Sequence, residues 1–128
     1  MTIKERIQGY LFKLELEHEQ VDEQTWIIHD QEAGLNQVVV CAEEPLVVIR
    51  VKVMRLPEHK RPQLFEDLLR LNATDLVHGA YALENEDIIL VDTLEIQTLD
   101  LEEFQASVEA VGLALAQHYP LLAKYMTD

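Results

Sequence analysis

The stretch LNATDLVHGAYALENEDIILV, residues Leu71–Val91, carries the signals that decide the fold. It reads as a helix end, a strand over Leu76–Leu83, a polar turn at Glu84–Asp87 and a second strand over Ile88–Thr93. The turn is short, and apolar residues flank it on both sides, which is typical of a β-hairpin. We therefore interpret the acidic residues and Gly79 as parts of a hairpin, with no catalytic motif among them.

Three further strands precede this hairpin along the chain. The segments Gln24–Asp30, Gln37–Glu43 and Leu46–Leu56 are rich in β-branched residues and are joined by short turns. In the third segment one alternating set of residues is wholly apolar, and the other set contains Arg50 and Lys52. The two sets consist of Val47, Ile49, Val51 and Val53, and of Val48, Arg50, Lys52 and Met54. This alternation predicts an antiparallel sheet covered on one face only, and the short connections favour a meander.

Three amphipathic helices complete the predicted order of elements. Apolar residues recur at helical spacing over Thr2–His18, over about Pro62–Asn72, and from Asp100 towards the C-terminus. Pro120 is expected to kink or end the last helix, because proline removes a backbone donor. The order α-βββ-α-ββ-α predicts an α+β fold, with helices packed on a five-stranded antiparallel sheet. We expect one domain over residues 1–128, because no repeat or linker divides the chain.

Charge and hydropathy exclude several classes of protein. The chain has 24 Asp and Glu against 10 Lys and Arg, a formal net charge of −14. Such a surface repels the phosphates of nucleic acids and of anionic membranes, so neither is an expected partner. No apolar run approaches the ~20 residues that a membrane helix needs, and no signal peptide is evident, so we expect a soluble protein. The single cysteine, Cys41, fits a cytoplasmic location.

The sequence predicts no catalytic, cofactor-binding or metal-binding residue. None of the five histidines shares the close spacing of a zinc motif with another, and Cys41 has no CxxC partner. His29 and Cys41 lie on neighbouring predicted strands, which leaves a Cys–His pair geometrically open. We interpret Cys41 as a small buried apolar residue. The turn at Glu84–Asp87 is too short for a calcium loop.

Two features have both a structural and a functional interpretation. Gly79 predicts a close approach by another part of the molecule or by a partner subunit. Half of the basic residues fall within twelve positions, namely Arg50, Lys52, Arg55, Lys60 and Arg61. This basic cluster is either a solvated outer face or a docking surface for an acidic peptide or for the acidic face of another copy.

Residues 68–116 resemble the YbjN family, which shares its fold with the chaperones of type III secretion. The matching motifs are LxLNA at Leu69–Ala73, GAYAL at Gly79–Leu83 and ILVDTL at Ile89–Leu94, together with the order of the elements. The resemblance implies a small, acidic, dimeric cytoplasmic protein without enzymatic activity. It also implies that an extended partner segment lies against the sheet and the first helix, or a regulatory role in sensory or stress responses.

We therefore expect a non-enzymatic chaperone-like or adaptor module that binds a polypeptide partner. Strand addition to a sheet edge would supply main-chain hydrogen bonds, and apolar pockets would supply selectivity. The candidate protein-binding residues are Tyr10, Leu14, Trp26 and Ile28 for apolar contact, with Arg50 and Lys52 for electrostatic steering. A homodimer is also expected, and its candidate interface comprises Leu64, Phe65, Leu68 and Gly79.

An alternative function belongs to another class: a small-molecule-binding or enzymatic α+β domain with a cavity between the last helix and the sheet. Its sign would be a polar group stranded among apolar neighbours, and His118 or His78 is the best candidate. A deep enclosed cavity lined by convergent polar groups would favour this alternative. A packed core with a groove or a bare sheet edge would favour the adaptor.

Overall fold

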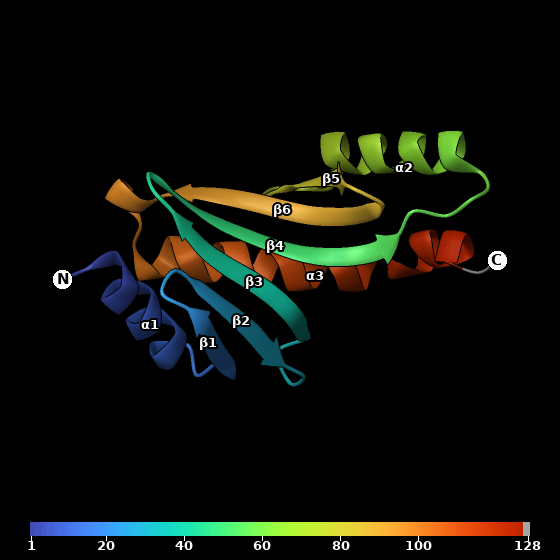
Figure 1. The fold of residues 1–128 in the computed structure, drawn as a ribbon. Helices are drawn as coiled ribbons and strands as arrows, with labels where there is room; N and C mark the ends of the chain where they lie inside the picture. The colour runs from blue at the N-terminus through green and yellow to red at the C-terminus, as the bar shows by residue number, and fades with distance from the viewer. Residues whose placement is uncertain (127–128) are drawn as a thin grey trace.

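The computed structural model describes residues 1–126, and it contains a six-stranded sheet and three α-helices (Figure 1). In chain order the elements are α1 (Ile3–Lys13), β1 (His18–Asp22), β2 (Thr25–Asp30), β3 (Leu35–Glu43), β4 (Leu46–Arg55), α2 (Arg61–Thr74), β5 (Ala80–Glu84), β6 (Asp87–Glu95), the 3-10 turn η1 (Ile96–Thr98) and α3 (Leu101–Met126). The α+β class is as predicted.

All strands pair antiparallel in the order β1-β2-β3-β4-β6-β5. The meander β2-β3-β4 and the β5-β6 hairpin follow the prediction. The number of strands was wrong, because His18–Asp22 forms β1 instead of continuing the first helix and a polar loop. Helix α1 ends at Lys13, and Glu15 then takes a left-handed φ of 55°, which turns the chain back along β2. Since most of β1 is exposed, it has no alternation of apolar residues from which to predict it.

Helix α3 continues through Pro120, so the proline does not end the helix, which was one of the two predicted outcomes. Proline at position 120 removes the hydrogen bond to the carbonyl of Ala116, one turn earlier. Both Ala116 and Pro120 are exposed, so water can satisfy that carbonyl. A proline on the solvent side of a long helix is therefore tolerated here.

The three helices share one apolar core with a single face of the sheet. Ile7 and Leu11 of α1, and Phe104 of α3, are fully buried in the same cluster as Trp26 and Ile49 of the sheet. In Figure 1, α3 runs along the sheet, α1 lies near β1 and β2, and α2 lies beyond β5. Burial of this apolar surface is the main force that holds the layers together.

The opposite, outer face of the sheet carries side chains that are only partly buried. Cross-strand pairing places Ile27, Val39, Arg50 and Val91 in one row on this face. Near its end β4 has a bulge between Lys52 and Met54, which turns Met54 into the core and leaves Val53 partly exposed. The predicted alternation was therefore reversed from that point, because a bulge shifts every later side chain to the other face.

Candidate functional site

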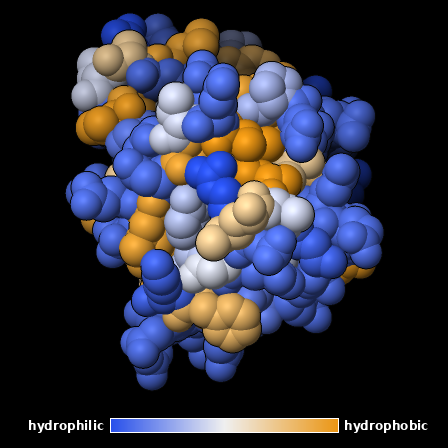
Figure 2. Space-filling view, turned by 90° about the vertical axis from the view of Figure 1, so that its left-hand side faces the viewer, coloured by the Kyte–Doolittle hydropathy of each residue, from blue (hydrophilic) through white to orange (hydrophobic). Residues whose placement is uncertain are grey.

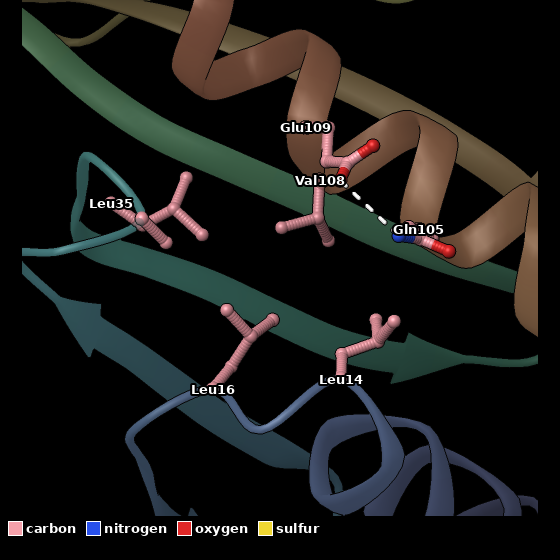
Figure 3. A pocket seen from close by; sticks show the side chains of 7 residues that line it. Leu14, Leu16, Leu35, Gln105, Val108 and Glu109 are labelled. Atoms are coloured by element: carbon pink, nitrogen blue, oxygen red, sulfur yellow. Dashed lines mark hydrogen bonds between the residues drawn. The ribbon is translucent and has the colours of Figure 1, made fainter.

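An open groove lies between α3 and the chain that connects α1 to β1 (Figure 3). Leu14 and Leu16 form one wall, Leu35 and Val108 form the other, and Glu109 stands at the rim. This part of the groove has a volume of about 240 Å³. Its side chains are mainly apolar, so it offers a site for one apolar side chain of a ligand.

The groove continues along α3 beneath the turn between β2 and β3. This second part shares Ala33 and Glu109 with the first, and its volume is about 650 Å³. Leu113 and Tyr119 line it, and each is 59% exposed. Gly112 forms part of its floor, where an added Cβ would stand 3.0 Å from Leu35 Cδ2. We call the two parts together the α3 groove.

The two edge strands of the sheet, β5 and β1, differ in whether a further strand could pair with them. At the β5 edge, the backbone N–H of Tyr81 donates to Asn72 Oδ1 at 2.7 Å, and Asn72 Nδ2 donates to the Tyr81 carbonyl at 3.2 Å. The amide of Asn72 thereby occupies the position of a neighbouring strand. At the other edge β1 pairs only with β2 among the described strands, so no strand covers its outer side. A free strand edge is a template for pairing with another chain.

The predicted apolar contact residues separate into two groups. Leu14 lines the α3 groove, and Tyr10 lines a neighbouring hollow beside α1 with Arg6 and Gly9. Figure 2 views the molecule from the α1 side and shows apolar surface framed by hydrophilic residues. Trp26 and Ile28 are fully buried in the core, so they offer no contact surface. They were misassigned because an alternating strand pattern does not reveal which face the helices cover.

Arg50 and Lys52 both form ion pairs with carboxylates of this protein. Arg50 lies 2.6 Å from Glu84 and 3.6 Å from Glu43, and Lys52 lies 3.2 Å from Asp87. These ion pairs neutralise both cations on the outer face. The cross-strand pairing that brings the carboxylates there could not be derived from the sequence of β4 alone.

The predicted interface residues are also partly used within the chain. Leu64 and Leu68 belong to the core, whereas Phe65 is only partly buried. Gly79 has a φ of 83°, and an added Cβ would stand 2.9 Å from the Val91 carbonyl oxygen. The close approach predicted at Gly79 therefore comes from strand β6.

His118 is buried in a polar cluster that joins α3 to β5 and α2. Its Nδ1 lies 2.6 Å from the Tyr81 hydroxyl, and its Nε2 lies 3.4 Å from Asp75 Oδ2. Burial and the nearby charge of Asp75 raise the pKa of Tyr81 to about 12. A second hydroxyl, that of Tyr125, donates to Asp67 Oδ2 at 2.6 Å. His118 Nε2 is buried without a hydrogen-bond partner among residues 1–126, which is the sign expected for the ligand-cavity alternative, but neither His118 nor Tyr81 lines the α3 groove.

The structure brings together neither the candidate Cys–His pair nor, within residues 1–126, a set of metal ligands. Cys41 pairs across the strands with Thr25, while His29 lies exposed towards the other end of β2. Cys41 is only partly buried, on the outer face, and not in the core as we predicted. Over residues 1–126 the structure has no group of three or more His, Cys, Asp or Glu side chains placed to hold a metal ion. None of the helices described here is both long and apolar enough to cross a membrane.

Sequence patterns do not single out most of the groove residues. Leu16 fits the apolar pattern predicted for the first helix, and Val108 and Tyr119 fit the apolar stripe of the last helix. A signal in the sequence was the apolar character of Leu113 and Tyr119, which α3 leaves exposed. Asn72 belongs to the LxLNA motif, and nothing in the sequence around it indicates a role for its side chain. Its hydrogen bonds to Tyr81 depend on how the end of α2 lies beside β5.

This architecture, an antiparallel sheet with helices on one face, is the fold of the type III secretion chaperones. The CesT_Tir_1 family model matches residues 1–128, and the chain belongs to this family of type III secretion chaperones. No curated protein sequence matches the chain.

Solved structures with this fold have low sequence identity to the chain. A chain of the heterodimeric ExoU–SpcU complex from the type III secretion system of Pseudomonas aeruginosa aligns with a TM-score of 0.73 at 15% identity, covering 90% of this chain and 96% of that one. YbjN from E. coli aligns with a TM-score of 0.69 at 15% identity, covering 94% and 92%. A chain of the HopA1–SchA chaperone–effector complex gives 0.67 at 8% identity, covering 89% and 90%.

Proposed function

We propose that this protein is a non-enzymatic chaperone-like or adaptor module that binds an extended segment of a partner polypeptide. The observation that carries the proposal is the α3 groove, an open apolar channel that Leu14 and Leu16 connect to the free edge strand β1. Membership of a chaperone family supports it. Similarity in fold to chains from chaperone–effector complexes supports it as well.

Two kinds of contact would hold the partner. A partner strand beside β1 would satisfy the outer backbone groups of His18–Asp22, which gives affinity with little dependence on sequence. An apolar side chain of the partner would enter the α3 groove between Leu14 and Leu35, which gives selectivity. Burying one Leu-sized side chain in this way contributes about 1.5–3 kcal/mol. Tyr10 would extend the apolar surface on the other side of α1.

The test uses the partner recovered by affinity capture from native lysate and then purified. Leu113→Asp places a charge in the α3 groove without disturbing the core, because Leu113 is exposed. Val77→Asp is the matched control, since Val77 is 89% exposed and lies in the loop before β5. We expect Leu113→Asp to weaken binding about tenfold, because it removes ~1.4 kcal/mol or more of apolar contact. Equal affinity of the two variants would reject the groove.

Strand addition has a separate readout in hydrogen exchange. Partner binding should slow the exchange of backbone amides within His18–Asp22, because new main-chain hydrogen bonds protect them. Amides in β3, which is paired on both sides, serve as the internal control. If the exchange of β1 is unchanged in the saturated complex, the partner binds without adding a strand.

We also propose a homodimer in which α2 faces α2 of a second copy. The support is the exposed apolar surface that Phe65 and Leu69 present, with Leu69 67% exposed. Leu69→Glu should convert the dimer to a monomer in sedimentation, because it places a carboxylate opposite its own copy. Wild-type protein that sediments as a monomer over the whole concentration range would contradict this proposal.

A further inference from the structure

The segment that connects β4 to α2 differs in charge from the rest of the chain. Arg55, His59, Lys60 and Arg61 fall within seven residues, and Glu58 is the only carboxylate among them. Arg55, His59 and Lys60 are exposed. We call Arg55–Arg61 the basic segment.

The cations of the basic segment lack the ion pairs that neutralise others in this protein. Of the ten Lys and Arg residues, five have a carboxylate oxygen within 4.0 Å, namely Lys4, Arg50, Lys52, Arg70 and Lys124. Within residues 1–126, no carboxylate approaches Arg55, Lys60 or Arg61 that closely, and Arg61 Nε donates to the carbonyl of Pro57. Among residues 1–126, these three cations therefore have no carboxylate partner, although the whole chain has 24 Asp and Glu.

The local backbone reinforces that charge. Helix α2 begins at Arg61, and its N-cap Lys60 has a left-handed φ of 61° and makes no side-chain capping bond. The first turn of α2 contains no acidic residue. The partial positive charge of the helix N-terminus is thus left unneutralised beside the basic side chains. A non-glycine residue at positive φ is also strained, and such strain is concentrated at functional positions.

A hollow with a mixed polar and apolar lining adjoins the basic segment. Its lining combines Arg55 and Glu58 with the apolar parts of Met54, Leu56, Pro57, Tyr125 and Met126, and its volume is about 310 Å³. Tyr125 and Met126 line the hollow at the C-terminal end of α3, whereas the α3 groove is lined by residues 105–119 of that helix, and the two share no residue. The two surfaces are therefore separate.

We propose that the basic segment and its hollow bind an acidic segment of a partner polypeptide in which carboxylates flank one large apolar side chain. The hollow accommodates the apolar side chain, and Arg55 and Lys60 attract the carboxylates. Because the net charge of −14 repels acidic partners elsewhere on the surface, this attraction also fixes where and in which register the segment docks. A nucleic acid meets the same repulsion and has no group that requires the apolar floor.

The test uses a short synthetic fluorescent peptide in which Asp and Glu flank a single Phe, with binding followed by anisotropy. Arg55→Glu should weaken binding about tenfold, because it replaces attraction by repulsion at the rim of the hollow. Lys13→Glu is the matched control, since Lys13 is an exposed cation at the end of α1 without a carboxylate partner among residues 1–126. Lys60→Asn removes a second charge while keeping a residue type that tolerates left-handed φ, and it should also weaken binding.

The remaining outcomes decide the chemistry of the partner. Replacing the Phe of the peptide by Ser, or its acidic residues by Asn and Gln, should each weaken binding, and added salt should weaken it too. Equal losses from Arg55→Glu and Lys13→Glu would overturn the proposal, because they would report net charge alone. Tighter binding of oligothymidylate than of the peptide would also overturn it. Leu113→Asp should leave peptide binding unchanged, so this proposal and the α3 groove fail or succeed independently.

Discussion

The side-chain amide of Asn72 forms two hydrogen bonds with the backbone of Tyr81, one to its N–H and one to its carbonyl. In this position the last turn of α2 caps the β5 edge of the sheet at Tyr81. The opposite edge, β1, has no such cover in residues 1–126. The partner strand that we propose would therefore add at β1, the edge that lies beside the α3 groove.

Asn72→Ala should destabilise the protein, because it leaves two backbone groups of β5 without partners. The expected loss in unfolding free energy is about 1–3 kcal/mol. Urea denaturation measures it, with Asn36→Ala as the control at an exposed asparagine in β3. An equal, small effect of both substitutions would show that water replaces the amide of Asn72.

Gly79→Ala and Gly9→Ala should change stability in opposite directions. At Gly79 the φ of 83° and the 2.9 Å approach to the Val91 carbonyl oppose a Cβ, so we expect a loss of about 1–3 kcal/mol. At Gly9, inside α1, a Cβ meets nothing within 4 Å, and alanine should add about 0.5–1 kcal/mol. Chemical denaturation of both variants checks the signs. A neutral Gly79→Ala would mean that β6 moves away at little cost.

Tyr81→Phe should cost far more stability than Tyr119→Phe. The first substitution removes the hydroxyl that bonds to the buried His118 and leaves its Nδ1 without that partner, at about 1–3 kcal/mol. The second removes a hydroxyl from a side chain that is 59% exposed. The measurement is the difference in urea midpoint between the two variants at neutral pH.

The stability of the protein should fall in alkaline solution as Tyr125 ionises. Its hydrogen bond to Asp67 raises its pKa to about 12, above the ordinary value of about 10. The folded state therefore holds this proton more tightly than the unfolded state does. The resulting stabilisation is complete below about pH 10 and is lost as the pH rises towards 12.

Tyr125→Phe provides the check on this pH dependence. The variant should lose stability at neutral pH, and its unfolding free energy should fall less steeply between about pH 10 and pH 12. The pKa of Tyr81 is also raised to about 12, so the unfolding free energy of both the wild type and the variant should still fall with pH in this range. Unchanged steepness in the variant would show that Tyr125 titrates alike in the folded and unfolded states.

Much of the architecture could be predicted from local patterns. Alternation in β4, the polar turn after Glu84 and the apolar stripe of α3 each report a periodicity that the backbone imposes. The strand β1 escaped prediction because an exposed edge strand does not need alternation. The change of face at Met54 could not be predicted, because the apolar residues around a bulge do not differ from those of a regular strand.

The sequence by itself determined the class of fold, the order of the longer elements and the acidic surface, since these depend on spacing and composition along the chain. Only the tertiary structure decided that Trp26 is core, that Arg50 is neutralised, that Asn72 caps β5 at Tyr81 and that Arg55 has no carboxylate partner among residues 1–126. Those outcomes depend on which distant residues meet across strands and between layers. Periodicity shows which side chains share a face where a strand is regular, but which face is covered and which residues it meets depend on other parts of the chain.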